Sequence, residues 1–313
     1  MGYNACRNAY LEEIVAATYA GEDVYLVAAD LAAPCLDKMR EDYPHRYVPV
    51  GIAEQNLIAV ASGLVLTGKK AIAYTGNPFL ISRAYDQIRN CVCSMHLPLA
   101  LVGLGAGFSQ PDYGFTHFIL EDINILRGST ELTILNLSDV NLAKYAAQKT
   151  LNLTSPIYVR IDRLVDAEYN LTENDIERGF RILHNAADKK VCVVSTGIMS
   201  TECFEVLNSS DEFSSNVGLI DVFSFPFDGK ALVDELKKYQ RIITVEEMRL
   251  QGGLGSAVLE TLGDAGVYIP VQRMGIDISR GISPHYGSRE WHLKQFGLDK
   301  NSIAEKISSA LKE

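Results

Sequence analysis

The chain has 313 residues, of which 47% are hydrophobic, 22% charged and 9% aromatic, and its formal net charge is -10 at pH 7. This composition is typical of a globular protein with room for two domains, and it argues against a disordered or fibrous chain. The sequence has no cluster of five or more Lys and Arg residues, which argues against nucleic acid as a partner.

Membrane contact and export are not expected either. The longest apolar stretch, residues 57–66, is about half the ~20 residues that a bilayer span requires. The N-terminal segment lacks the basic and then apolar regions of a secretory signal. The six cysteines lie among apolar neighbours, which is typical of free thiols in a reducing compartment. We therefore expect a cytoplasmic protein.

Short apolar runs alternate with helical patterns in the first half of the chain. The runs lie at residues 24–29, 47–50, 71–74, 99–104, 132–135 and 156–161, and the helical patterns at 5–20, 53–66, 82–94, 121–127 and 139–150. Apolar runs without polar alternation are typical of strands covered on both faces. The alternation predicts a parallel α/β sheet, which we assign to a first domain at residues 1–165.

A charged and irregular segment, residues 166–188, follows and is predicted to link two domains. Apolar runs return at residues 191–195, 217–222, 241–245 and 269–274, with helical patterns at 201–208, 229–239, 255–262 and 301–311. These residues predict a second, smaller α/β domain at residues 189–313.

Polar motifs occur in a specific order along this framework. They are GIAEQN at 51–56, SRAYDQIR at 82–89, GFTH at 114–117, YVRIDR at 158–163, STG at 195–197, VEE at 245–247 and GGLGS at 252–256. The ordered set resembles the transketolase family of thiamine diphosphate enzymes and covers nearly the whole chain. The resemblance implies a pyrimidine-binding domain followed by the family's C-terminal domain.

Glu54 stands in the first turn of a predicted helix. The resemblance implies that its carboxylate lies beside N1' of the aminopyrimidine ring and so activates the cofactor. A first-turn carboxylate that only complements the helix dipole is the simpler alternative. The family's aromatic positions beside the ring fall on Asn77 and Leu80, so either Phe79 or Leu80 is expected to contact the cofactor. A plain core Phe at position 79 is equally compatible with the sequence.

Four residues match family positions on the substrate side. The resemblance implies that His117 faces the reacting oxygens, that Arg7 and Arg163 bind a phosphate or acidic end, and that Asp30 meets a hydroxyl group. The residues alone also allow a structural His, surface arginines and a turn-forming Asp. Arg83 and Arg160 are expected to be structural ion-pair partners.

Several positions depart from the family pattern, three of them near the expected site. Gly105 stands where the family has a second histidine, Tyr113 where it has an Asp, and Asn77 where it has an aromatic residue. These departures allow a reaction that differs from simple sugar-phosphate transketolase activity.

The family's magnesium motif, Gly-Asp-Gly followed by Asn, does not occur in the sequence, and residues 227–229 have the wrong flank for it. Mg2+ needs such hard oxygen ligands to hold the diphosphate. The resemblance therefore implies no metal site in this chain and an N-terminal partner subunit that holds Mg2+ and the diphosphate. It also implies a homodimer of this chain within a heterotetramer.

The expected activity is transfer of a two-carbon ketol unit from a ketose to an aldose, with sugars or sugar phosphates as substrates. One alternative is a decarboxylating thiamine enzyme, similar to deoxyxylulose-phosphate synthases or to the β subunits of 2-oxo acid dehydrogenases. Another is a non-catalytic subunit that retains the fold.

Overall fold

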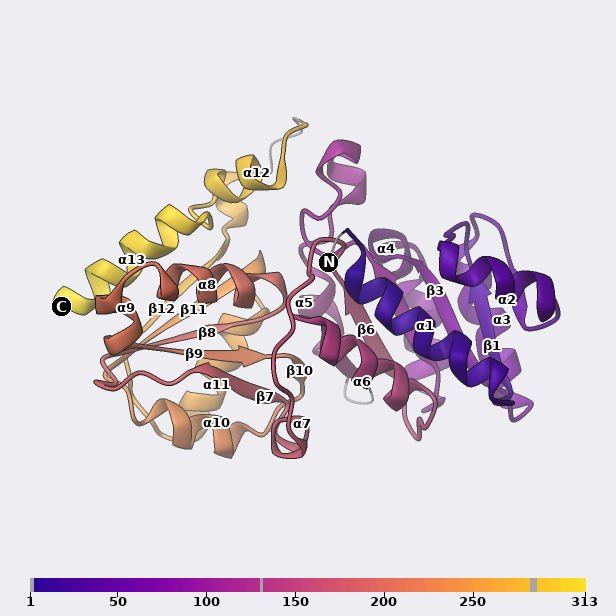
Figure 1. Ribbon diagram of the computed structural model, residues 1–313, viewed down its shortest axis with the longest axis horizontal. Coiled ribbons are helices and arrows are strands. Elements are labelled where there is room, and N and C mark those ends of the chain that lie inside the picture. Colours follow the sequence, from indigo (N-terminus) through magenta and orange to yellow (C-terminus); the bar gives the residue numbers. More distant parts are fainter. Residues whose placement is uncertain (1–2, 130–131, 282–285) are drawn as a thin grey trace.

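The computed structural model describes residues 3–129, 132–281 and 286–313. The chain forms two α/β units that lie next to each other, with the C-terminus at the far end of the second unit (Figure 1). Each unit has a central sheet with helices on both faces, as buried apolar strands require.

The first unit contains a mostly parallel sheet of seven strands. Its elements are α1 Ala5–Tyr19, β1 Val24–Ala28, α2 Asp37–Asp42, β2 Tyr47–Pro49, α3 Glu54–Leu66, β3 Lys70–Gly76, α4 Asn77–Gln87, β4 Ala100–Leu104, α5 Asp122–Leu126, β5 Thr133–Asn136, α6 Val140–Thr150, β6 Ile157–Ile161 and, from the second half of the chain, β10 Ser224–Phe225. The strand order is β10-β5-β6-β4-β3-β1-β2, and β10 pairs antiparallel with β5. One strand of the second half thus extends the first sheet.

The second unit contains a smaller sheet of five strands. Its elements are α7 Glu173–Arg178, β7 Phe180–His184, β8 Val191–Ser195, α8 Ile198–Asn208, α9 Asp211–Asn216, β9 Val217–Val222, α10 Gly229–Leu236, β11 Arg241–Arg249, α11 Leu254–Asp264, β12 Val271–Ile276, α12 Arg289–Gln295 and α13 Lys300–Lys312. The strand order is β12-β11-β8-β9-β7, and β7 pairs antiparallel with β9. The predicted fold class, two α/β domains with the smaller one second, is confirmed.

The hydrophobic core is continuous across the two units. One apolar cluster combines α3, α4 and α5 of the first unit with α10 and α11 of the second. A second cluster lies under α1, α2 and α6, and a third lies under α8 and α13. The shared cluster fixes the two sheets relative to each other.

Two local features differ from the sequence interpretation. Helix α4 begins at Asn77, five residues earlier than the predicted helix at 82–94, and the Pro in its first turn suits a helix start. Phe79 therefore lies in the first turn of α4. The segment expected to be a linker, residues 166–188, contains α7 and β7, and β7 is an edge strand of the second sheet.

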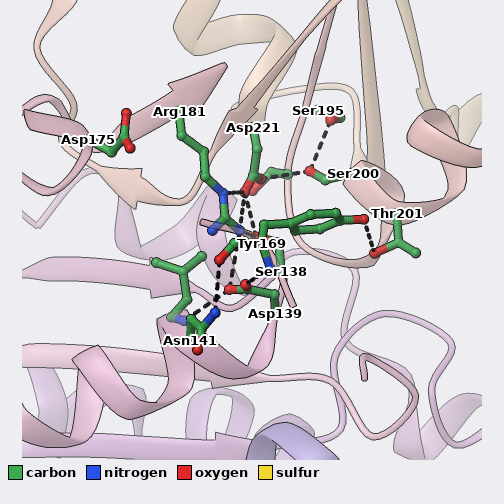
Figure 2. Close-up of polar contacts among 12 residues, drawn as sticks. Ser138, Asp139, Asn141, Tyr169, Asp175, Arg181, Ser195, Ser200, Thr201 and Asp221 are labelled. Carbon is green, nitrogen blue, oxygen red and sulfur yellow. Dashed lines mark hydrogen bonds and ion pairs between the residues drawn. The ribbon is translucent and has the colours of Figure 1, made fainter. Parts of the chain in front are cut away.

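A buried polar network joins the two units at the carboxyl ends of β8 and β9 (Figure 2). Arg181 of β7 forms ion pairs with Asp139 of the first unit at 3.2 Å and with Asp221 of β9 at 3.0 Å. The Ser138 hydroxyl donates to Asp221 at 2.5 Å, and the Ser200 hydroxyl donates to the same carboxylate at 2.7 Å. All of these side chains are buried, so side chains of the first unit fill this edge of the second sheet.

Candidate active site at the carboxyl edge of the first sheet

Glu54 begins α3, directly after the short strand β2 and the turn that follows it. Its side chain is only 5% exposed. The Nη1 atom of Arg83 donates to both carboxylate oxygens, at 3.2 Å and 3.1 Å, and the Arg83 side chain is 49% exposed. The structure therefore holds a buried carboxylate whose charged partner reaches it from the solvent side.

Arg83 also covers the ring of Phe79, one turn earlier on α4. The guanidinium carbon lies 4.3 Å from the Phe79 ring centre, and the His117 ring meets the same phenyl ring edge-on at 5.0 Å. Leu80, the other candidate for cofactor contact, is fully buried in the core. Phe79 is thus the one of the two that contacts Arg83 and His117.

His117 is partly exposed on the loop between β4 and α5. Its Nδ1 atom lies 3.0 Å from the Thr116 hydroxyl, and the Tyr113 ring lies 4.8 Å from the imidazole. Burial lowers the pKa of His117, and the positive charge of Arg83 lowers it further. The imidazole is therefore neutral at pH 7 and able to accept a proton.

A cavity of about 260 Å³ opens between α4 and this loop. Its lining includes Pro78, Phe79, Ser82, Arg83, Phe115, Thr116, Phe118, Leu120 and Glu121. The cavity therefore gives access to the phenyl ring and the guanidinium group beside the Glu54 carboxylate.

The two candidate arginines both form hydrogen bonds with residues near the start of the chain. Arg7 is 9% exposed, and its guanidinium donates to the Asn8 side chain at 3.0 and 2.8 Å. The Asn4 backbone N–H donates to the Arg163 carbonyl at 2.7 Å, and Arg163 Nε donates to the Asn4 side chain at 3.3 Å. No ion pair joins either arginine to a carboxylate within the described part of the chain. Both are therefore available to an anion.

Tyr74 is a residue of this region that the sequence interpretation missed. Its hydroxyl is buried and has no hydrogen-bond partner among the residues described. Burial raises the pKa of Tyr74, while the charges of Arg7 and Arg163 act to lower it. Arg7 and Arg163 are distant from Tyr74 in the sequence, so no local pattern could have identified this residue. Asp30, by contrast, is exposed after β1 in a left-handed conformation with φ 47°.

Two of these departures from the family pattern, Gly105 and Asn77, have structural explanations. Gly105 has φ 99°, and a Cβ at this position would collide with the side-chain amide of Gln110. Asn77 is fully buried and accepts a hydrogen bond from the Tyr158 hydroxyl at 2.5 Å, which holds the start of α4. Tyr113 is 59% exposed at the tip of the His117 loop.

Both arginines expected to be ion-pair partners form ion pairs. Arg83 pairs with Glu54, and Arg160 pairs with the buried Asp122 at 2.6 Å.

Among the described side chains, no group of three or more His, Cys, Asp or Glu residues is placed to hold a metal ion. No helix in the described ranges combines the length and apolar character needed to cross a bilayer.

Comparisons with known proteins identify the same two units. A family model of the transketolase pyrimidine binding domain matches residues 4–165, and one of the transketolase C-terminal domain matches residues 181–303. An apulose-4-phosphate transketolase subunit of Actinobacillus succinogenes is 30% identical, over 95% of this chain and 96% of that protein. A putative transketolase C-terminal section of Methanocaldococcus jannaschii is 28% identical, over 99% of this chain and 98% of the relative.

A solved structure agrees with the sequence comparisons. It is described as a split gene transketolase, inactive beta4 tetramer, and it is 26% identical with a TM-score of 0.83 over 98% of both chains. The two family models, the subunit-length relative and the solved structure all correspond to this chain over most of its length. The chain therefore belongs to the transketolase family and corresponds to the C-terminal subunit of a split transketolase.

Proposed function

We propose that this chain, together with a partner subunit that holds Mg2+ and the diphosphate, transfers a two-carbon ketol unit from a ketose to an aldose. The observation that carries the proposal is the buried Glu54 carboxylate paired with Arg83, which covers the Phe79 ring that His117 meets, at the open edge of the first sheet. Open α/β sheets bind ligands at this edge. The family membership supports the same reaction class.

The residues fit the aminopyrimidine half of thiamine diphosphate. Glu54 offers a carboxylate for a ring N–H, and Phe79 offers an aromatic face. The planar guanidinium of Arg83 makes both kinds of contact in the free chain, and its exposed side chain has room to turn outward. When bound, thiamine diphosphate supplies the carbon nucleophile that takes up the ketol unit.

The protein's own groups then have separate tasks. Glu54 holds a proton at N1' of the pyrimidine, which a buried carboxylate next to a ring nitrogen can share. His117 accepts and returns the hydroxyl protons of the sugar, because its lowered pKa keeps the imidazole neutral. Phe79 would offer its ring to the pyrimidine and would exclude water from this proton.

The distal end of the substrate is expected to carry an anion. Arg7, Arg163 and the Tyr74 hydroxyl, which has no partner among the described residues, would bind it, and Asp30 would accept a hydrogen bond from a sugar hydroxyl. Relatives of this chain are named for apulose-4-phosphate and for 6-deoxy-6-sulfo-D-fructose, the latter from a Clostridium species and 28% identical over 95% of this chain and 91% of the relative. We infer a sugar phosphate or another sugar with an acidic end.

A decarboxylating activity is the second candidate. The 1-deoxy-D-xylulose-5-phosphate synthase of Caldanaerobacter subterraneus is 31% identical over 86% of this chain, which spans 43% of that protein.

We expect the working assembly to contain two copies of this chain and two of the partner, and the mass of the copurified complex tests that composition.

Product analysis with the copurified complex tests the reaction. A ketose phosphate with an aldose acceptor is expected to give the chain-extended ketose, and pyruvate is expected to give no CO2. Release of CO2 from pyruvate without ketol transfer would favour the synthase-type reaction. A complex inactive in both assays, despite bound thiamine diphosphate, would favour a non-catalytic subunit.

A further inference from the structure

The loop that carries His117, residues 105–121, has little regular structure of its own. It contains two short turns of 3-10 helix, Pro111–Tyr113 and Phe115–His117. One backbone contact joins its two sides, from the Ile119 N–H to the Gly107 carbonyl at 3.3 Å. Local structure of this kind opens at low cost, so the orientation of His117 depends on its contact with Phe79 and on what the base of the loop packs against.

Two phenyl rings from the base of the loop and one imidazole from the second domain form a three-ring clamp. Phe108 and Phe118 meet edge-on at 5.0 Å. His292 of α12 stacks on Phe108 at 4.9 Å, with 12° between the ring planes, and meets Phe118 edge-on at 4.9 Å. Each ring therefore touches the other two, and all three are buried. Phe118 directly follows His117 in the chain.

Helix α12 is itself fixed to the first domain. Arg289, one turn before His292, donates to Glu247 of β11 at 2.8 Å and to Asp162 at 3.0 Å. All three residues are buried. A Cβ on Gly107 would collide with the Glu247 carboxylate, so the base of the loop rests directly against this ion pair. The helix thus holds the loop on one side and the segment before Arg163 on the other.

We propose that His292 is a positioning residue for His117, because its ring ties both sides of the 105–121 loop to the second domain. The Nε2 atom of His292 is buried without a hydrogen-bond partner among the described residues, so the ring acts through its aromatic surface. The clamp stands on the structure alone. Its importance for catalysis rests on the proposed role of His117.

Hydrogen exchange of the full chain, followed by mass spectrometry of peptides, tests the clamp. In His292→Ala, amides of residues 115–120 are expected to exchange about tenfold faster than in the wild type, while peptides of β3 and β8 keep their rates. His292→Phe is expected to restore the wild-type rate because the planar ring remains. Phe213→Ala is the matched control, since it removes a ring from the same apolar cluster on α9, which Figure 1 shows at the far end of the second unit.

Three outcomes would overturn the proposal. They are an unchanged loop in His292→Ala, an equal acceleration in Phe213→Ala, and a failure of His292→Phe to restore protection. If the alanine variant does not fold, His292→Leu, which fills the space without a planar ring, is expected to show the same local acceleration. In the complex with its partner, His292→Ala is expected to lower kcat more than it raises KM.

The exchange result does not depend on the reaction. If the loop responds as expected and His117→Asn leaves ketol transfer intact, the clamp is correct and the catalytic role of His117 is wrong. If His117→Asn abolishes transfer and the loop does not respond, the catalytic role of His117 is correct and the clamp is wrong.

Discussion

The two parallel sheets of this chain use their carboxyl edges in opposite ways. In the first sheet, Glu54, Asp30 and Arg163 follow strand ends at an edge that gives onto a cavity and solvent. In the second sheet, the corresponding edge is filled by Ser138 and Asp139 of the first domain, which contact Arg181 and Asp221 (Figure 2). The edge where α/β sheets usually bind ligands can therefore serve either as a site or as a joint between domains.

The largest expected effect on stability comes from breaking the buried polar network that joins the two domains. Arg181→Met would leave the buried carboxylates of Asp139 and Asp221 without a cation, which we expect to cost about 3–5 kcal/mol in the free energy of unfolding. Urea unfolding of the full chain measures this loss. Lys237→Met is the control, because Lys237 pairs with Asp234 at the surface, where the two side chains are 51% and 60% exposed, and its loss should cost less than about 1 kcal/mol. Equal losses in the two variants would mean that the second edge is not a joint.

The next effect tests whether the open edge accepts a second histidine. Gly105→His would force a side chain onto a backbone with φ 99° and into the Gln110 amide, and we expect a loss of about 1–3 kcal/mol. Adding Gln110→Ala should recover part of this loss, because only the backbone strain remains. Gly63→Ala in α3, where a Cβ meets open space, should be neutral or stabilising. Unfolding experiments on the wild type, the two single variants and the double variant measure these differences. A Gly105→His variant as stable as the wild type would contradict the account of this position.

A smaller effect is expected from the ion pair at the open edge. Arg83→Met leaves Glu54 without its cation, but the arginine is half-exposed, so we expect a loss of about 1 kcal/mol. In the background of Glu54→Gln the same substitution should cost almost nothing. A double-mutant cycle on the free energy of unfolding measures this coupling. Purely additive losses would show that the contact is not formed in solution.

The smallest expected effect is on the loss of stability at acid pH when the imidazole of His292 is replaced. Burial lowers the pKa of His292 below its ordinary 6.5, so the unfolded chain binds protons at pH values where the folded chain does not. Stability should therefore fall as pH drops below about 6.5, and His292→Phe should remove about 1 kcal/mol or less of that fall. Unfolding at pH 7.5 and 5.5 gives the comparison. A variant as acid-sensitive as the wild type would contradict a lowered pKa of His292 in the folded chain.

Most of the fold could be predicted because its signals are local. Apolar runs without alternation predict covered strands, and they located the strands from β1 to β6 within a few residues. Strand β10 was missed because it has two residues and pairs with a strand of the other domain. Strand β7 was missed because it lies in a charged segment, where its buried Arg181 is indistinguishable in sequence from a surface arginine.

The site was predictable only in part. The order of motifs pointed to Glu54 and His117, and the structure connects them through Phe79 and Arg83. Tyr74 and His292 could not be found in this way. Their importance comes from contacts with residues distant in the sequence, and such contacts leave no local pattern.

The central claim is that the open edge of the first sheet uses the Glu54 carboxylate for proton transfer at the pyrimidine. Ketol transfer by the complex containing Glu54→Gln, with the exposed Glu41→Gln as control, tests it most directly. The account predicts that Glu54→Gln lowers kcat by about 10²- to 10⁴-fold, while Glu41→Gln keeps the wild-type rate. A Glu54→Gln complex that turns over as fast as the wild type would contradict it.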